Sequence, residues 1–171
     1  MPRASRFAAM KLADTDPLTG LQKRRDFESV AESGIRTQRR SGEAFPPSLL
    51  NIDNFNGAND AAGHHVGDRT LTCLAAFLRE QARGIDTVAR LGGDEFANLM
   101  PNAGALQFRA PCRHLRKTVA GQIRAAGFDT TASISCSVFM RAPKAVAQAL
   151  AAADNTLYLA KSGGKNCSVV C

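Results

Sequence analysis

One short stretch of the sequence carries the residue types that a metal-bound phosphate needs. Two glycines, Gly92 and Gly93, come directly before two acids, Asp94 and Glu95. Apolar runs lie on both sides, which predicts a β-hairpin with these four residues at its turn. Glycines let the backbone take positive φ and come close to a ligand, and the acids are presented at the hairpin tip. Taken alone, the stretch is also explained as a tight turn with two solvated acids.

Other segments of the sequence favour the phosphate-binding interpretation of this turn over the simple tight turn. Asn51–Asp68 follows a predicted strand over residues 48–53, and most of it matches the pattern D-x-D-x-F-K-x-x-N-D-x-x-G-H-x-x-G-D. Asp16–Leu21 matches D-x-L-T-G-L, and Ala153–Asn166 matches most of A-D-x-A-L-Y-x-A-K-x-x-G-R-N. With Gly92–Phe96, these segments occur in the order found in the GGDEF family of diguanylate cyclases. The chain resembles that family from about Asp14 to Val170.

The resemblance implies a metal-dependent catalytic site. Asp94 and Glu95 would be its acidic catalytic groups, and Asp94 and the carbonyl of Ile52 would bind Mg²⁺ or Mn²⁺. Asn51 stands where the family has a further metal-binding aspartate. The lost charge is worth on the order of several kcal/mol at an effective dielectric of about 20. We expect weaker metal binding, which an amide oxygen and substrate phosphates still allow.

The resemblance also implies a GTP site. Asn59 and Asp68 would bind guanine, whose N1–H and amino groups donate hydrogen bonds. Without the resemblance, these two residues would be interpreted as a turn residue and a helix N-cap. Four residues would contact phosphates: Gly92, Gly93, Lys161 and Lys165.

Two further departures from the family pattern affect the predicted phosphate site. Lys165 replaces an arginine, which keeps the charge but loses the bidentate fork, so we expect weaker phosphate binding. Asn56 replaces a phosphate-facing lysine. Basic residues near a helix C-terminus also stabilise the helix dipole, which is the simpler explanation for Lys161 alone.

A short motif precedes the hairpin. Arg83 and Asp86 form R-x-x-D, which resembles the inhibitory site where cyclic di-GMP limits its own synthesis in this family. A guanidinium can grip phosphate or the guanine edge, and a carboxylate can accept hydrogen bonds from guanine. The alternative is a surface arginine beside an acid that begins a strand.

Hydrophobic periodicity predicts the elements that would position these residues. Helices are expected from the Gln22 region to about Arg40, over Thr70–Arg83, across most of Gly104–Gly127 and from Pro143 through Lys161. Strands are expected at residues 48–53, in the hairpin, at 130–139 and after Asn166. The resemblance implies an α+β fold: a central, mostly antiparallel five-stranded sheet surrounded by helices, nucleotide-cyclase-like with a ferredoxin-like core. Ser135 replaces a family glycine in the strand at 130–139, where its side chain is expected to crowd a neighbour.

Length and composition fit one domain. The 171 residues are divided here into residues 1–13, a linker or connecting helix, and residues 14–171, the GGDEF domain. No apolar run approaches the roughly 20 residues of a membrane span, and no signal peptide is recognised, so we expect no membrane insertion. Five cysteines without a C-x-x-C pair indicate reduced thiols and a cytoplasmic location.

The net charge of +7 suggests an anionic partner. A nucleic-acid surface would combine basic clusters with aromatic residues, but the chain has no Trp and one Tyr. Nucleotide phosphates therefore explain the charge more simply.

The implied reaction condenses two GTP molecules into cyclic di-GMP and pyrophosphate in bacterial second-messenger signalling. It needs a homodimer, because each subunit holds one GTP. Two hypotheses stay open: a cyclase weakened by its substitutions, or a degenerate module that binds GTP or cyclic di-GMP and regulates a neighbouring domain. Such a parent protein is expected to carry a sensor domain or an EAL phosphodiesterase domain.

Overall fold

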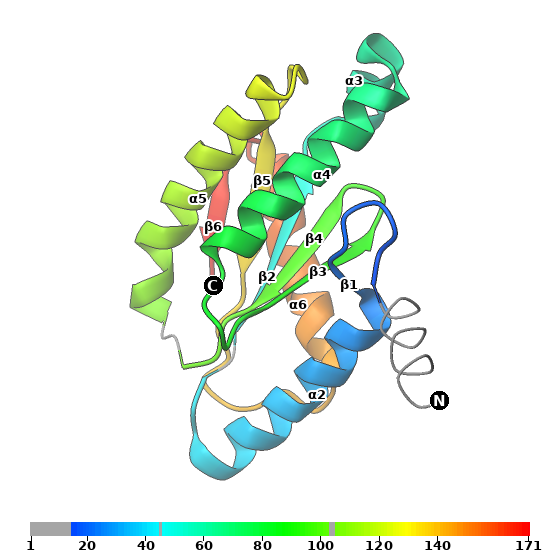
Figure 1. The fold of residues 1–171 in the computed structure, drawn as a ribbon. Helices are drawn as coiled ribbons and strands as arrows, with labels where there is room; N and C mark the ends of the chain where they lie inside the picture. The colour runs from blue at the N-terminus through cyan, green and yellow to red at the C-terminus, as the bar shows by residue number, and fades with distance from the viewer. Residues whose placement is uncertain (1–14, 45, 103–104) are drawn as a thin grey trace, which may run out of the picture.

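Figure 1 shows the computed structural model of the chain, which describes residues 15–44, 46–102 and 105–171. For residues 105–111 the backbone alone is described. The predicted linker or connecting helix, residues 1–13, lies outside the described residues.

A single sheet forms the centre of the described part of the chain. Its six strands have the order β1-β3-β4-β2-β5-β6. Their bounds are β1 Gln22–Lys23, β2 Pro47–Ile52, β3 Thr87–Gly92, β4 Glu95–Leu99, β5 Ala132–Cys136 and β6 Ser168–Val170. The inner pairs β3–β4, β4–β2 and β2–β5 are antiparallel, whereas β1–β3 and β5–β6 are parallel.

The α+β prediction is confirmed, but the strand count is wrong and the sheet is mixed. The additional strand is β1, whose two residues pair in parallel with Ala89 and Arg90 of β3. Two residues are too few to produce a periodic pattern, so this strand can be recognised only from its pairing with β3.

The helices cover both faces of the sheet, as Figure 1 shows. Helices α2 and α6 pack on one face, and α4 and α5 pack on the other. The helix bounds are α2 Arg24–Ser41, α3 Phe55–Ala62, α4 His64–Gln81, α5 Ala105–Ala125 and α6 Val146–Ser162. No helix of the described residues is long and apolar enough to cross a membrane.

Strand β2 has every residue buried, because both its faces are covered. Leu50 and Ile52 pack towards α4 and α5, whereas Leu49 packs towards α2 and α6. The alternation follows from the two-residue period of a strand. It holds the carboxyl end of β2, where Asn51, Ile52 and Asp53 lie, between two hydrophobic layers.

The structure corrects two sequence expectations between β2 and β5. Helix α4 begins at His64, before the predicted Thr70, and a separate helix α3 precedes it; Gly63, with φ +89°, joins the two. Ser135 is fully buried without crowding a neighbouring strand, and its Oγ donates a 2.9 Å hydrogen bond to the Ala153 carbonyl in α6.

Candidate functional site

The turn between β3 and β4 lies beside the end of β2. The Ile52 backbone N–H donates a 3.3 Å hydrogen bond to the Asp94 carbonyl, and Asn51 lies opposite Glu95 in the β2–β4 register. Gly93 has φ +47°, which favours glycine. A Cβ at Gly92 or Gly93 would meet no atom within 4 Å, so the turn backbone is open to an approaching group.

Oxygen donors dominate this group of residues. Across residues 15–44, 46–102 and 105–171, no three His, Cys, Asp or Glu side chains gather closely enough to hold a metal ion by themselves. Mg²⁺ in nucleotide sites needs only one or two carboxylates when phosphates supply further oxygens. Asp94, Glu95, the Asn51 amide and the Ile52 carbonyl therefore fit a divalent cation with one fewer negative charge than the family pattern provides.

Glu95 already faces a positive charge. Arg24, the first residue of α2, places its Nη2 3.7 Å from Glu95 Oε2, and both side chains are about half exposed. An exposed pair of this length contributes little to stability. The arginine still lowers the net negative charge at the turn, so a cation must compete with it.

The acid directly after β2, Asp53, forms hydrogen bonds within the fold. The buried Asp53 carboxylate accepts hydrogen bonds from Thr131 Oγ1 at 2.6 Å, Ser133 Oγ at 2.8 Å and the Asn166 backbone N–H at 2.9 Å. Arg116 of α5 also donates to the Asn166 carbonyl at 2.8 Å. These bonds fix the segment after α6 against the end of β2.

That attachment brings the two predicted phosphate-binding lysines towards the same end of the sheet. Lys161 lies in the last turn of α6, and the Lys165 backbone N–H donates to its carbonyl at 3.2 Å. Lys165 is exposed, has φ +61°, and directly precedes the anchored Asn166. The anchoring role of Asp53 was not predicted from the sequence, where the hydroxyls at the alternate positions Thr131 and Ser133 are its only signal.

A second anchor holds the hairpin turn. The Arg90 guanidinium lies 3.0 Å from Asp16 Oδ1 and donates bonds of 2.9 and 2.7 Å to the Gly93 carbonyl. Asp16 Oδ1 also accepts from the Thr19 backbone N–H at 2.9 Å and the Thr19 hydroxyl at 2.6 Å. Burial alone would raise the pKa of Asp16, but these hydrogen bonds and the Arg90 charge hold the pKa below its ordinary value. We call this chain of contacts the Asp16–Arg90 brace.

The two predicted guanine ligands lie on neighbouring helices. Asn59 belongs to α3, and its Oδ1 is buried without a hydrogen-bond partner. Asp68 is exposed on α4 and follows Gly67, where a Cβ would overlap Asn59 Oδ1. Because α3 starts two residues after Asp53, the end of β2 connects these helices to the hairpin group. An unpartnered buried amide oxygen is suited to accept from an N–H of a base.

Arg83 and Asp86 lie together, as the motif requires. Arg83 Nη2 is 2.7 Å from Asp86 Oδ1 and donates to the Pro101 carbonyl at 3.0 Å. The hydrogen bond to Asp86 raises the pKa of Arg83 above its ordinary value. A cavity of about 360 Å³ borders both residues and also Arg79 and Gly84. The pair is therefore already ordered beside an open space.

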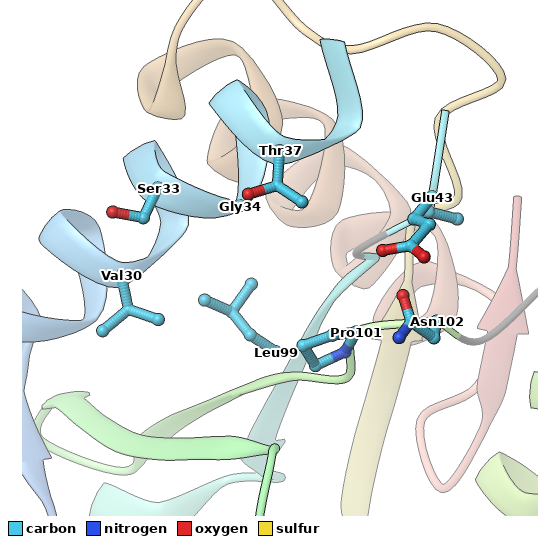
Figure 2. Close-up of a pocket in the computed structure, with 9 residues that line it drawn as sticks. Val30, Ser33, Gly34, Thr37, Glu43, Leu99, Pro101 and Asn102 are labelled. Atoms are coloured by element: carbon cyan, nitrogen blue, oxygen red, sulfur yellow. The ribbon is translucent and has the colours of Figure 1, made fainter. Parts of the chain in front are cut away.

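A different cavity lies away from the Gly92–Glu95 turn. Its volume is about 220 Å³, and Figure 2 shows Val30, Gly34 and Thr37 of α2 facing Leu99 and Pro101 across it. Leu99 ends β4, whereas the Gly92–Glu95 turn precedes that strand. This cavity contributes nothing to the predicted nucleotide site.

Known proteins resemble the chain over nearly all its length. Residues 13–167 match the family described as "Diguanylate cyclase, GGDEF domain". Diguanylate cyclase DgcP of Pseudomonas aeruginosa is 32% identical over 155 residues, which are 89% of this chain and 23% of DgcP. Response regulator PleD of Caulobacter vibrioides is 31% identical over 166 residues, which are 94% of this chain and 37% of PleD. The chain thus spans well under half the length of both relatives.

The fold agrees with solved structures. The coiled coil and GGDEF domain of DgcB from Caulobacter crescentus, in complex with c-di-GMP, has a TM-score of 0.90 at 26% identity, covering 99% of this chain and 91% of that one. Diguanylate cyclase SiaD of Pseudomonas aeruginosa, in complex with its activator SiaC, has a TM-score of 0.79 at 28% identity, covering 99% and 66%. The sequence match, the fold and the motif residues agree, and the chain belongs to the GGDEF family of diguanylate cyclases.

Proposed function

We propose that this domain condenses two GTP molecules into cyclic di-GMP and pyrophosphate, with weakened turnover. The observation that carries the proposal is the contact between Ile52 and Asp94, which joins the glycine-acid turn to the end of β2. It supports one site in which Asp94, Glu95 and Asn51 face a nucleotide phosphate.

The residues of each subunit hold and orient one GTP. Lys161 and Lys165 neutralise the triphosphate, and the exposed backbone at Gly92 and Gly93 admits it. Asn59 and Asp68 accept hydrogen bonds from the guanine edge and so select guanine over adenine. In a homodimer with two-fold symmetry, the 3′-oxygen of each GTP bonds to the other's α-phosphorus while the bond to pyrophosphate breaks.

A divalent ion fits the oxygen donors at the turn. Asp94, the Asn51 amide and the Ile52 carbonyl would hold Mg²⁺ or Mn²⁺, with Glu95 beside them. When bound, such an ion polarises the phosphate and lowers the pKa of the attacking hydroxyl. An amide in place of a carboxylate at position 51 weakens this binding, which is the physical reason to expect slow turnover.

The second candidate is a module that binds GTP or cyclic di-GMP without appreciable turnover and regulates a neighbouring domain. The buried amide of Asn51 opposite Glu95 favours it. A neighbouring phosphodiesterase domain has a precedent among relatives: MucR of Pseudomonas aeruginosa is named a bifunctional diguanylate cyclase and cyclic di-GMP phosphodiesterase.

Product analysis separates the two candidates. The protein is incubated with GTP and Mg²⁺ or Mn²⁺, and products are resolved by chromatography. Restoring the carboxylate with Asn51→Asp is expected to raise the yield of cyclic di-GMP by about tenfold or more. Asn155→Asp adds the same charge on the exposed face of α6 and is the matched control. If neither the wild-type protein nor Asn51→Asp forms product, while GTP still raises the melting temperature of both, the domain is the binding module instead.

We also propose that the Arg83–Asp86 pair binds cyclic di-GMP. The ordered guanidinium and the adjoining cavity support this site. Arg83→Ala is expected to abolish binding in calorimetry, because it removes the bidentate donor. Arg36→Ala, which truncates an arginine of similar exposure to solvent on α2, is the control. Equal affinity of the wild-type protein and Arg83→Ala would reject the site.

A further inference from the structure

Three cysteines gather at one end of the sheet, away from the Gly92–Glu95 turn. Cys112 of α5 and Cys136, the last residue of β5, are both buried and share a small hydrophobic cluster with Met100, Val138 and Val170. Cys171 follows β6, and its backbone N–H donates to the Cys136 carbonyl at 3.0 Å. The proposed cyclase reaction uses none of these thiols.

Cys112 and Cys136 pack against each other as the two buried members of this cluster. They share a hydrogen bond, in which the Cys136 thiol donates to the Cys112 sulfur and lowers the pKa of Cys112. The same bond, together with burial, raises the pKa of Cys136. Cys112 is therefore the more acidic thiol of the pair, and Cys136 holds its proton more tightly.

A small molecule can reach this pair from one side. Cys112 lines a cavity of about 160 Å³, together with Gln81, Asp86, Asn98 and His114. A water molecule occupies about 30 Å³ in the liquid, so a peroxide only slightly larger fits. Cys136 has no exposed surface. Oxidants therefore meet Cys112 first.

We propose that Cys112 and Cys136 form an oxidant-reactive dithiol whose reagent is hydrogen peroxide. The Cys112 sulfur attacks one peroxide oxygen, the O–O bond breaks, and sulfenic acid and one water are produced. The Cys136 sulfur then attacks the Cys112 sulfur, and the hydroxyl leaves with the Cys136 proton as a second water. Two thiols are oxidised to a disulfide, and one peroxide is reduced to two waters.

The resulting bond would join α5 to β5. In a reducing cytosol such a disulfide is transient, and cellular thiols return it to the dithiol form. The opposing explanation is that both thiols are inert core residues, since buried cysteines generally are. The two explanations differ in which cysteine reacts first.

Peroxide titration followed by non-reducing peptide mapping tests the proposal on the unmodified chain. We expect a Cys112–Cys136 disulfide, with thiols titratable in denaturant falling from five to three because the bond consumes two. Cys73→Ser removes an exposed cysteine of α4 and is expected to leave the Cys112–Cys136 disulfide and the loss of two thiols unchanged. Cys112→Ser is expected to abolish the disulfide, and its melting curve checks that it folds.

Three results would overturn the proposal. The first is oxidation of exposed Cys73 while Cys112 and Cys136 stay reduced, which would identify the pair as core residues. The second is a Cys136–Cys171 disulfide as the main product, which would assign the chemistry to the other neighbour. The third is a Cys112–Cys136 disulfide that forms only in denaturant, because peroxide would then reach Cys112 by unfolding and not through the cavity.

Discussion

At the scale of single residues, the candidate site depends on a glycine, Gly67, whose lack of a side chain leaves room for the Asn59 amide. Gly67 occupies a buried position in α4, and the space that its Cβ would fill contains the Asn59 amide. Asn59 Oδ1 is left without a partner inside the protein. Burying an amide oxygen unpaired is unfavourable by about 1–3 kcal/mol, so a ligand donor there recovers stability. We infer that Gly67 positions Asn59 for the predicted guanine contact.

Gly67→Ala tests this role. The new methyl group would displace the Asn59 amide, so we expect GTP affinity to fall about tenfold, the equivalent of one lost hydrogen bond. ATP affinity is expected to change much less, because adenine does not present the same donors. Thermal shift with each nucleotide measures both affinities.

Gly121→Ala is the matched control for that substitution. Gly121 lies in α5, and a Cβ there would meet no atom within 4 Å. This variant is expected to gain roughly 0.5–1 kcal/mol of helix stability and to bind GTP as the wild type does. An unchanged preference for GTP over ATP in Gly67→Ala would show that Gly67 serves packing alone.

At the scale of elements, the Asp16–Arg90 brace fixes the hairpin turn from outside the hairpin. Asp16 belongs to the loop before β1, Arg90 to β3, and the Gly93 carbonyl to the turn itself. The glycine turn alone would be mobile, because glycine loses the most conformational entropy on ordering. The brace therefore supplies part of the rigidity that the Asp94 site needs.

The brace predicts a pH dependence of stability. Asp16 has a folded pKa below its unfolded value of about 3.9, so its contribution is fully present above that value and is lost as the pH falls through the folded pKa. Asp16→Asn is expected to lower stability by about 1–2 kcal/mol at neutral pH. The difference from wild type should shrink as the pH falls below about 3.9, because the unfolded chain takes up the proton before the folded one does.

Thermal melts across that pH range measure the effect. Asp154→Asn, which changes an exposed acid on α6, is the control and should differ from wild type by little at any pH. A destabilisation by Asp16→Asn that does not change as the pH falls below about 3.9 would show that the carboxylate charge does not support the brace.

The sequence was informative about elements that have their own pattern. The hairpin, β2, β5 and the four longer helices follow apolar periodicity and turn residues, which are local signals. Strand β1 and the separate helix α3 were missed, because a two-residue strand depends on its partner and α3 has no buried residue. Asp94, Ile52 and the other motif residues came from the family resemblance. Asp53 and Arg90 were missed as anchors, since their partners lie 113 and 74 residues away.

At the scale of the whole molecule, the proposed reaction has a geometric requirement. One chain presents one Gly92–Glu95 turn and thus one proposed GTP site, whereas the product contains two GMP units. Joining both units needs two chains facing each other with two-fold symmetry. If dimers are scarce, their concentration rises with the square of the protein concentration.

The initial rate of cyclic di-GMP synthesis by Asn51→Asp, the more active form in our proposal, is therefore expected to rise with the square of protein concentration at the dilute end and to become linear as dimers saturate. Fusing a parallel coiled coil before residue 15 would raise the effective concentration of each chain for its partner, so the rate should become linear throughout. A rate proportional to concentration in the unfused protein, measured where sedimentation shows only monomers, would contradict the two-subunit reaction. Asn51 lies in the proposed site of a single chain, so its substitution is not expected to alter how the rate depends on protein concentration. The same titration with the wild-type protein checks this expectation.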